Sequence, residues 1–264
     1  MKITFPNVNL NYSLHNHSNF SDGANSIEEM CQGAKAAGIK VFGLSDHWLI
    51  PPTDKIDASS WAMNPNNLEL YIETLLKLKH TLEDEEFSLK IGLEVDFFFE
   101  NIDDVFKNLK QYPLDYLIGS VHYAGIFPVD NNIKYWVNLT PEDKEEICET
   151  YYTKLIGAAA RTEFTFLGHL DLPKKFNLID NKKYISRAIE VLDVAQQHGN
   201  AIELNTSGFF KECNEQYPCL EILEAAYLRN IPILVNADAH DVKHVNRNFL
   251  EAAELLKIAK YRIL

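Results

Sequence analysis

Histidine and acidic residues recur in this sequence close to the ends of short apolar runs. Six of the nine histidines do so together with three acids: His15, His17, Asp22, His47, Glu94, His122, His169, Asp238 and His240. His15 and His17 are two residues apart, as are Asp238 and His240, so each pair points to one side of an extended strand. The other histidines, His80, His198 and His244, fall in predicted helices or in segments that connect them.

Imidazole and carboxylate groups gathered at one place form a polar cluster whose burial is costly unless a cation organises it. The set contains no thiolate, which favours Zn, Mn or Fe over Cu(I), a cysteine zinc site or an iron–sulfur cluster. Nine ligands are too many for one ion, so we expect two or three divalent metal ions. Each histidine alone could be an ordinary core or surface residue hydrogen-bonded to a neighbour. Only their joint placement argues for metal.

Alternating apolar runs and helical patterns would position these residues. A first helix opens with the capping box of Ser26 and Glu29 and ends before Gly38, where a left-handed cap is expected. Further helices are predicted near 67–84, 103–111, 182–198, 218–229 and 246–259, and one more starts with Pro141 at its first position. Strands are predicted before His15 and at 39–44, 89–94, 114–121, 164–167, 201–204 and 231–235.

About seven strands alternating with helices predict an α/β fold with a parallel sheet, most simply a barrel. A doubly wound open sheet is the alternative. In a parallel barrel the carboxyl ends of all strands open on one face, where active sites lie. The histidines and acids would then converge there.

Length and composition fit one soluble domain. The 264 residues match the roughly 250-residue size of an α/β barrel, so we expect residues 1–264 to form a single domain. The net charge of −13 opposes a broad nucleic-acid surface, and no stretch reaches the roughly 18 apolar residues of a membrane span. The four cysteines form no CxxC pair, which indicates a reducing compartment. We expect a cytoplasmic protein without nucleic-acid or membrane partners, and its oligomeric state stays open.

Seven segments in order along the chain resemble the motif series of the polymerase and histidinol phosphatase (PHP) family: His15–Gly23, Leu44–His47, Gly92–Asp96, Gly119–Tyr123, Gly168–Asp171, Glu203–Gly208 and Asp238–His240. The segments SVHY and ELNTSG are most similar to its histidinol-phosphatase branch. The resemblance implies a distorted seven-stranded (β/α)7 TIM-like barrel with a trinuclear metal site. It also implies hydrolysis of L-histidinol phosphate, a small phosphorylated substrate, in histidine biosynthesis.

Carried over by motif, the ligands divide into three groups. The first metal would be held by His15, His17, Glu94 and Asp238. The second would be held by Glu94, as a bridge, with His122 and His169. The third would be held by Asp22, His47 and His240. A clamp of several metals suits the hydrolysis of phosphomonoesters, which is among the slowest uncatalysed reactions.

Further residues are candidates for substrate contact and proton transfer. Asp238 or His240 would donate the proton to the leaving group, although both are also proposed ligands. Lys175, with Lys174 beside it, could meet phosphate, and Asn205 and Ser207 could orient substrate; a solvated loop and turn-forming residues are the alternatives. Asp96 and Asp171 could pair with a substrate ammonium or with ligating imidazoles.

Two other functions remain open at this stage. A nucleotide phosphoesterase or exonuclease of the same family would need a basic, aromatic-lined channel, which the acidic sequence does not suggest. A metal-binding module without catalysis would be expected to have lost ligands, whereas every motif position is filled here.

Overall fold

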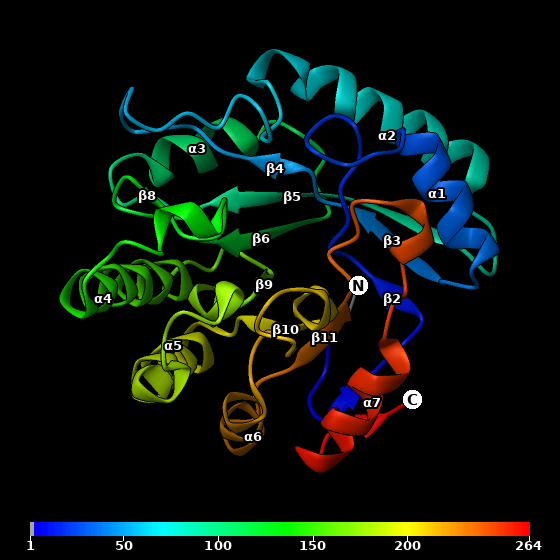
Figure 1. Ribbon diagram of the computed structural model, residues 1–264. Helices are drawn as coiled ribbons and strands as arrows, with labels where there is room; N and C mark the ends of the chain where they lie inside the picture. The colour runs from blue at the N-terminus through cyan, green and yellow to red at the C-terminus, as the bar shows by residue number, and fades with distance from the viewer. Residues whose placement is uncertain (1–2) are drawn as a thin grey trace.

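Seven parallel strands form a nearly closed barrel at the centre of the computed structural model, which describes residues 3–264 (Figure 1). Their order around the barrel is β2 (Tyr12–Ser13), β3 (Val41–Leu44), β5 (Ser88–Asp96), β6 (Tyr116–Ser120), β9 (Phe166–Leu167), β10 (Ala201–Asn205) and β11 (Ile233–Asn236). The short strand β4 (His47–Trp48) adds to β5, with His47 opposite Glu94. The predicted barrel is therefore confirmed, and the open-sheet alternative is wrong.

The barrel closes between β2 and β11 at the residues that follow them. Asn16 and Ala239 form an isolated parallel bridge, and the amide of His17 donates to the carbonyl of Ala239 at 2.9 Å. Nearer the strands themselves, the backbone amide of Leu14, just after β2, donates to the side-chain oxygen of Asn236, at the end of β11, at 2.8 Å. Closure thus brings the first and last predicted metal-binding segments side by side.

Seven α-helices among the described residues surround the strands, as Figure 1 shows: α1 (Ile27–Ala36), α2 (Leu68–Leu82), α3 (Ile102–Leu109), α4 (Pro141–Ala159), α5 (Ile185–His198), α6 (Leu220–Leu228) and α7 (Phe249–Ile258). The predicted capping box of Ser26 and Glu29 opens α1, and Gly38 follows its end with φ +79°. α7 begins at Phe249 and not near residue 246, because Asn248 before it has a left-handed backbone with φ +59°.

Two small sheets complete the fold. β1 (Asn7–Val8) pairs in parallel with β12 (Arg262–Ile263), which joins the two ends of the chain. β7 (Tyr123–Ala124) and β8 (Phe127–Pro128) form an antiparallel hairpin beyond β6. Within residues 3–264, no helix has both the length and the apolar composition that crossing a bilayer requires.

Inward-facing side chains of β10 change from apolar to polar along the strand. In β10, Ala201 belongs to an apolar cluster with Leu14, Tyr116, Ile118, Phe166 and Leu234. Glu203 and Asn205, two and four residues further on, point to the same side, and Asn205 donates to Glu203 at 2.9 Å. The barrel therefore has an apolar floor and a polar mouth, and the functional residues stand on a packed base.

Glycine at position 92 makes room for the central ring of this floor. The Tyr116 hydroxyl donates to the carbonyl of Leu14 at 2.5 Å, and its ring stacks on Phe166. A Cβ atom at Gly92 would lie 2.3 Å from that ring. The ring has little freedom to move away, since its hydroxyl is hydrogen-bonded to Leu14 and its face stacks on Phe166.

We predict that Gly92→Ala lowers the free energy of unfolding by about 2 kcal/mol or more, because overpacking a fixed ring strains the core. Urea denaturation measures this. Gly38→Ala is the control, since a Cβ atom there meets nothing within 4 Å and only its positive φ is penalised, at about 1 kcal/mol. Equal losses in the two variants would show that the Tyr116 ring can move aside.

Candidate metal centre

All nine predicted ligands lie together at the polar mouth of the barrel. His15 and His17 follow β2, His47 starts β4, and Glu94 lies within β5. The others come from the segments after β6, β9 and β11 and from the loop before α1: His122, His169, Asp238, His240 and Asp22. β5 runs two residues beyond its predicted end, so Glu94 is buried inside the mouth and Asp96 occupies the strand end.

Glu94 is the centre of the cluster. Its two carboxylate oxygens lie within 3.6 Å of ring nitrogens of five histidines: His15, His17, His47, His122 and His169. The shortest distances join Oε2 to His47 Nδ1, at 2.8 Å, and Oε1 to His169 Nε2, at 2.9 Å. The two oxygens therefore face different groups of imidazoles, which is the arrangement a bridging ligand needs.

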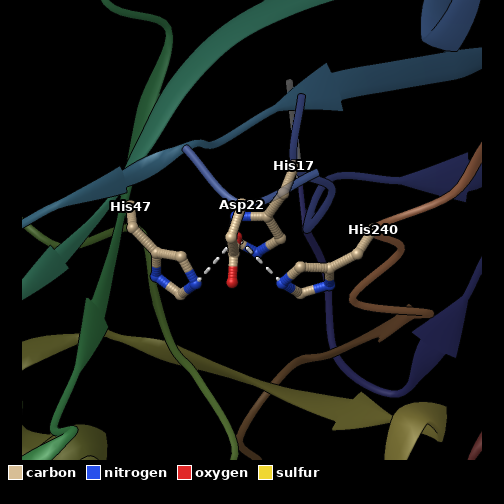
Figure 2. A group of neighbouring side chains, drawn as sticks. All are labelled: His17, Asp22, His47 and His240. Carbon is tan, nitrogen blue, oxygen red and sulfur yellow. Dashed lines mark ion pairs between the residues drawn. The ribbon is translucent and has the colours of Figure 1, made fainter. Parts of the chain in front are cut away.

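Asp22 forms a second, more open centre. Figure 2 shows its carboxylate between the rings of His47 and His240, with Oδ1 3.6 Å and 3.2 Å from their Nε2 atoms. The ring of His17 stacks on both, with centroids 4.2 Å and 4.3 Å away. One ligand atom from each of these four residues lies within 4.8 Å of the others, a compact set that one ion could contact.

Asp238 completes the first predicted group. Its Oδ1 lies 3.1 Å from His17 Nε2 and 3.6 Å from His15 Nε2. Three further sets of ligand atoms are equally compact: His15, Glu94 and His169; His15, His17 and Asp238; His47, Glu94 and His122. Among the four sets, His15, His17, His47 and Glu94 each occur twice, so the sets overlap with the three predicted groups without coinciding with them.

Several buried atoms of this cluster lie close to one another but make no hydrogen bond of suitable geometry among the described residues. They are Nε2 of His15, both ring nitrogens of His17, Nδ1 of His47 and of His169, Oε2 of Glu94 and Oδ1 of Asp238. Buried polar atoms in folded proteins are almost always paired. A cation bound among them would supply the missing partner, so the donor set fits divalent metals.

The pKa shifts agree with a cation site. Burial and the neighbouring His47 and His240 lower the pKa of His17 to about 3, which leaves its ring neutral with a free lone pair. Burial opposes the charged form of Glu94, but the surrounding imidazoles hold its pKa well below the usual range. Against the same penalty, Asp96 and Glu94 raise the pKa of His122 to about 10. The ionised carboxylates thus demand positive charge, which metal ions could supply in exchange for imidazole protons.

Glu203 accepts hydrogen bonds that orient residues of the cluster. This fully buried carboxylate lies 3.0 Å from Nδ1 of His15 and accepts from the amide of His169 at 2.9 Å. It also accepts from the side-chain amides of Asn205 and Asn236, each at 2.9 Å. A carboxylate on the far nitrogen of a histidine fixes the ring and its tautomer. No role was predicted for Glu203 from the sequence, although an acid inside an apolar strand is a signal that could have found it.

Asp96 fixes the ring of His122 in the way that Glu203 fixes that of His15. Asp171, by contrast, does not face the site. Asp96 accepts from Nδ1 of His122 at 2.7 Å and from its amide at 2.9 Å. Asp171 is buried against Lys174 Nζ, 2.9 Å away. The expectation that either acid is free for a substrate ammonium is therefore wrong, while the alternative, pairing with a ligating imidazole, describes Asp96.

Two of the ligand candidates sit on strained backbone. His169 has φ +21° and Asp238 has φ +50°, values that residues with a side chain rarely adopt. Both lie two residues beyond a strand of the barrel, where the chain must turn while the side chain faces inward. Strain of this kind persists where surrounding contacts fix it, and it is common at functional sites.

A cavity of about 560 Å³ opens over the cluster. Among the predicted substrate residues, Lys175 and Ser207 line it, whereas Asn205 is buried beneath and donates to Asp238 at 3.1 Å. The cavity is also lined by residues for which the sequence predicted no role: Trp61, Tyr123, Asp130, Lys211 and Arg247. His244 lines it too, while His80 lies on α2 and His198 at the end of α5.

Comparison with known proteins identifies relatives along most of the chain. The PHP domain matches residues 13–207. A protein of Deinococcus radiodurans named "Probable histidinol-phosphatase" is 32% identical over 87% of this chain and 85% of its own length. One of the same name from Thermotoga maritima is 25% identical over 95% and 93%.

A solved structure has a similar fold. It is that of histidinol phosphate phosphatase from Lactococcus lactis subsp. lactis in complex with zinc, L-histidinol and phosphate. It superposes with a TM-score of 0.82, at 21% identity, over 97% of this chain and 96% of its own.

We predict that Glu203→Gln weakens metal binding by ~10- to 100-fold, because the neutral amide no longer fixes the His15 ring and its tautomer. Titration with buffered Zn²⁺ measures this. Glu190→Gln is the matched control, since Glu190 pairs with Arg187 on the outer surface of α5 and should leave affinity unchanged. Unaltered affinity in the Glu203 variant would show that His15 is oriented without it.

Proposed function

This chain belongs to the PHP domain family, and we propose that it is a metal-dependent phosphomonoesterase that hydrolyses L-histidinol phosphate to L-histidinol and phosphate. Relatives named as histidinol-phosphatases and the fold shared with the Lactococcus lactis enzyme support this substrate and a role in histidine biosynthesis. The observation that carries the reaction class is the convergence of six histidines and three acids, with Glu94 at their centre, under a cavity large enough for a small substrate.

The proposal includes three divalent ions. His15, His17, Glu94 and Asp238 would hold the first, and Glu94 would bridge to a second held by His122 and His169. Asp22, His47 and His240 would hold the third. Bound there, divalent metals would supply Lewis acidity toward the phosphoryl oxygens and would lower the pKa of water. Zn, Mn and Fe fit the donors, and the zinc named in the Lactococcus lactis structure favours the first.

Proton transfer to the leaving alkoxide is assigned to Asp238 or His240. Both line the cavity, and the His240 side chain, 38% exposed, is the more accessible of the two. Against the effect of burial, the hydrogen bond to Asp22 raises the pKa of His240 to about 9, so a His240 ring that does not coordinate metal holds a proton at neutral pH. Asn205 and Ser207 orient Asp238 from the other side, at 3.1 Å and 3.4 Å from its Oδ2.

Cations around the cavity would meet the phosphate. Lys175 lies beside the cluster, where its Nζ contacts Oδ2 of Asp130 at 3.0 Å. Arg247 has no carboxylate within 4 Å among the described residues, and its guanidinium lies over the Phe210 ring, 3.7 Å from the centroid. Its charge is therefore available to an anion that enters the cavity.

Asp130 is the best partner for the positive end of the substrate. Apart from Asp22 and Asp238, it is the only carboxylate among the described residues that line the cavity. Burial opposes its charge, but Lys175 and His122 lower its pKa to about 2, so it is ionised at neutral pH. Trp61 and Tyr123, stacked with centroids 6.3 Å apart, offer an aromatic wall to an imidazole.

We assign residues 1–264 to one catalytic domain, supported by the pairing of β1 near the amino end with β12 near the carboxyl end. We place the reaction in the cytoplasm, supported by free cysteines that include the buried Cys31, Cys148 and Cys219.

We predict about three transition-metal ions per chain in protein purified without chelator, because the donors divide into the three proposed groups, two of which share Glu94. Elemental analysis after loading with Zn or Mn measures this. Glu94→Gln should lower both metal content and turnover, the latter by at least ~10²-fold, since a bridging ligand serves two ions. His80→Ala, on the exposed side of α2, should change neither. One ion or none in the loaded wild type would contradict the trinuclear site.

We predict that L-histidinol phosphate exceeds p-nitrophenyl phosphate, AMP and oligonucleotides in kcat/KM by at least ~10², about 2.7 kcal/mol of differential transition-state binding. The metals favour one phosphate, the net charge of −13 penalises each further one, and Asp130 favours a cation. Phosphate-release assays at one pH and metal concentration measure this.

Asp130→Asn should remove most of this advantage while p-nitrophenyl phosphate turnover stays within a few fold, because only the first substrate carries a cation. Asp103→Asn is the control, since Asp103 is an exposed carboxylate on α3 that is paired with Arg161. Faster cleavage of an oligonucleotide than of histidinol phosphate would instead indicate a nuclease.

A further inference from the structure

A second cavity, of about 430 Å³, lies outside the metal-bearing mouth. One wall is the side of α4 that carries Thr150, Thr153 and Lys154. The loop Pro52–Ile56, the turn Phe98–Glu100 after β5 and the tip of the β7–β8 hairpin form the rest. The residues described so far as metal ligands do not line it.

Lys154 is a buried cation at this cavity. It is 6% exposed, and its Nζ donates one hydrogen bond, to the carbonyl of Tyr123 at 2.6 Å. The same atom lies 3.8 Å from the centroid of the Phe98 ring. No carboxylate lies within 4 Å of it among residues 3–264. An ammonium has three donors, so Lys154 retains hydrogen-bonding capacity for an anionic group.

The walls of the cavity are apolar, and two of their side chains stand unusually exposed. Ile56 and Phe98 are buried in it, whereas Phe99 is 58% exposed and Ile126 is 55% exposed at its rim. Large apolar side chains grouped at the entrance of a cavity indicate a ligand with an apolar body.

The rim carries negative charge. Glu100 and Glu146 lie there without an ion pair within 4 Å among the described residues, while Glu149 is paired with Arg187 at 2.9 Å. A ligand with only a negative charge would be attracted by Lys154 but repelled by this rim. A ligand with only a positive charge would be attracted by the rim but repelled by Lys154. A molecule with both charges satisfies the two ends together.

We propose that this cavity binds a small zwitterion with an aromatic side chain, an aromatic amino acid, whose carboxylate meets Lys154 and whose ammonium faces Glu100 and Glu146. The aromatic body lies between Phe98, Phe99 and Ile126. Tyr123 links the two cavities, since it lines the metal-bearing mouth and its carbonyl accepts a hydrogen bond from Lys154. The site is therefore next to the active site but separate from it.

The test is isothermal titration of the metal-loaded protein with L-phenylalanine, in saturating inorganic phosphate so that the active site is filled. We expect binding below about 10 mM that phosphate does not abolish. 3-Phenylpropanoate, which lacks the amine, and phenethylamine, which lacks the carboxylate, should each bind at least ~10-fold more weakly, a loss of about 1.4 kcal/mol. No binding of L-phenylalanine to the wild type, or binding that phosphate abolishes, would overturn the proposal.

Variants locate the site. Lys154→Met should weaken L-phenylalanine binding by at least ~10-fold, because the buried counter-charge is lost. Lys144→Met is the matched control, since Lys144 is on the same helix and also donates to a backbone carbonyl, that of Leu178, but lies outside the cavity. Thr150→Phe fills the cavity and keeps Lys154, so it should abolish binding even if Lys154→Met fails to fold. Wild-type affinity in Thr150→Phe would overturn the proposal.

Discussion

The structure depends on one buried negative charge, the carboxylate of Glu94 at the centre of the barrel mouth. A carboxylate at 1% exposure loses its hydration, and that loss must be offset by nearby charges and donors. Five imidazoles within 3.6 Å provide this. These rings need fixed orientations of their own, which Glu203 and Asp96 impose on His15 and His122. Burial of one carboxylate therefore requires polar side chains from several strands of the barrel, first the imidazoles and then the acids that orient them.

The barrel meets this requirement by separating packing from chemistry along each strand. The inward positions begin with apolar residues such as Ala201 and Leu234, which pack around Tyr116, and continue with polar ones. The alternation of period two keeps both kinds on the same face. The polar network thus lies on a packed apolar floor, and the strained backbone of His169 and Asp238 follows strands whose residues Phe166 and Leu234 belong to that floor.

The sequence predicts the barrel and the nine clustered residues because both depend on local patterns. A capping box, a glycine after a helix and a histidine after an apolar run are visible within a few residues. The partners of these residues are not visible in this way. Glu203 is 188 positions from His15, and Asp130 is 45 positions from Lys175, so only the fold brings them together. The same limit explains why Asp96 and Asp171 looked equivalent in sequence although one holds His122 and the other pairs with Lys174.

Local and global charge act in opposite directions in this protein, and that opposition defines what can bind. The net charge of −13 repels anions at a distance, but repulsion between exposed charges fades within about 10 Å in salt. Inside the cavity, Lys175 and Arg247 act at contact distance, and Asp130 stands beside Lys175 with the opposite sign. A ligand with one phosphate and one nearby cation matches both signs, whereas a polyanion matches only the first. Selectivity for a compact, doubly charged substrate therefore follows from where the few charges that line the cavity lie, with no need for a tightly closed pocket.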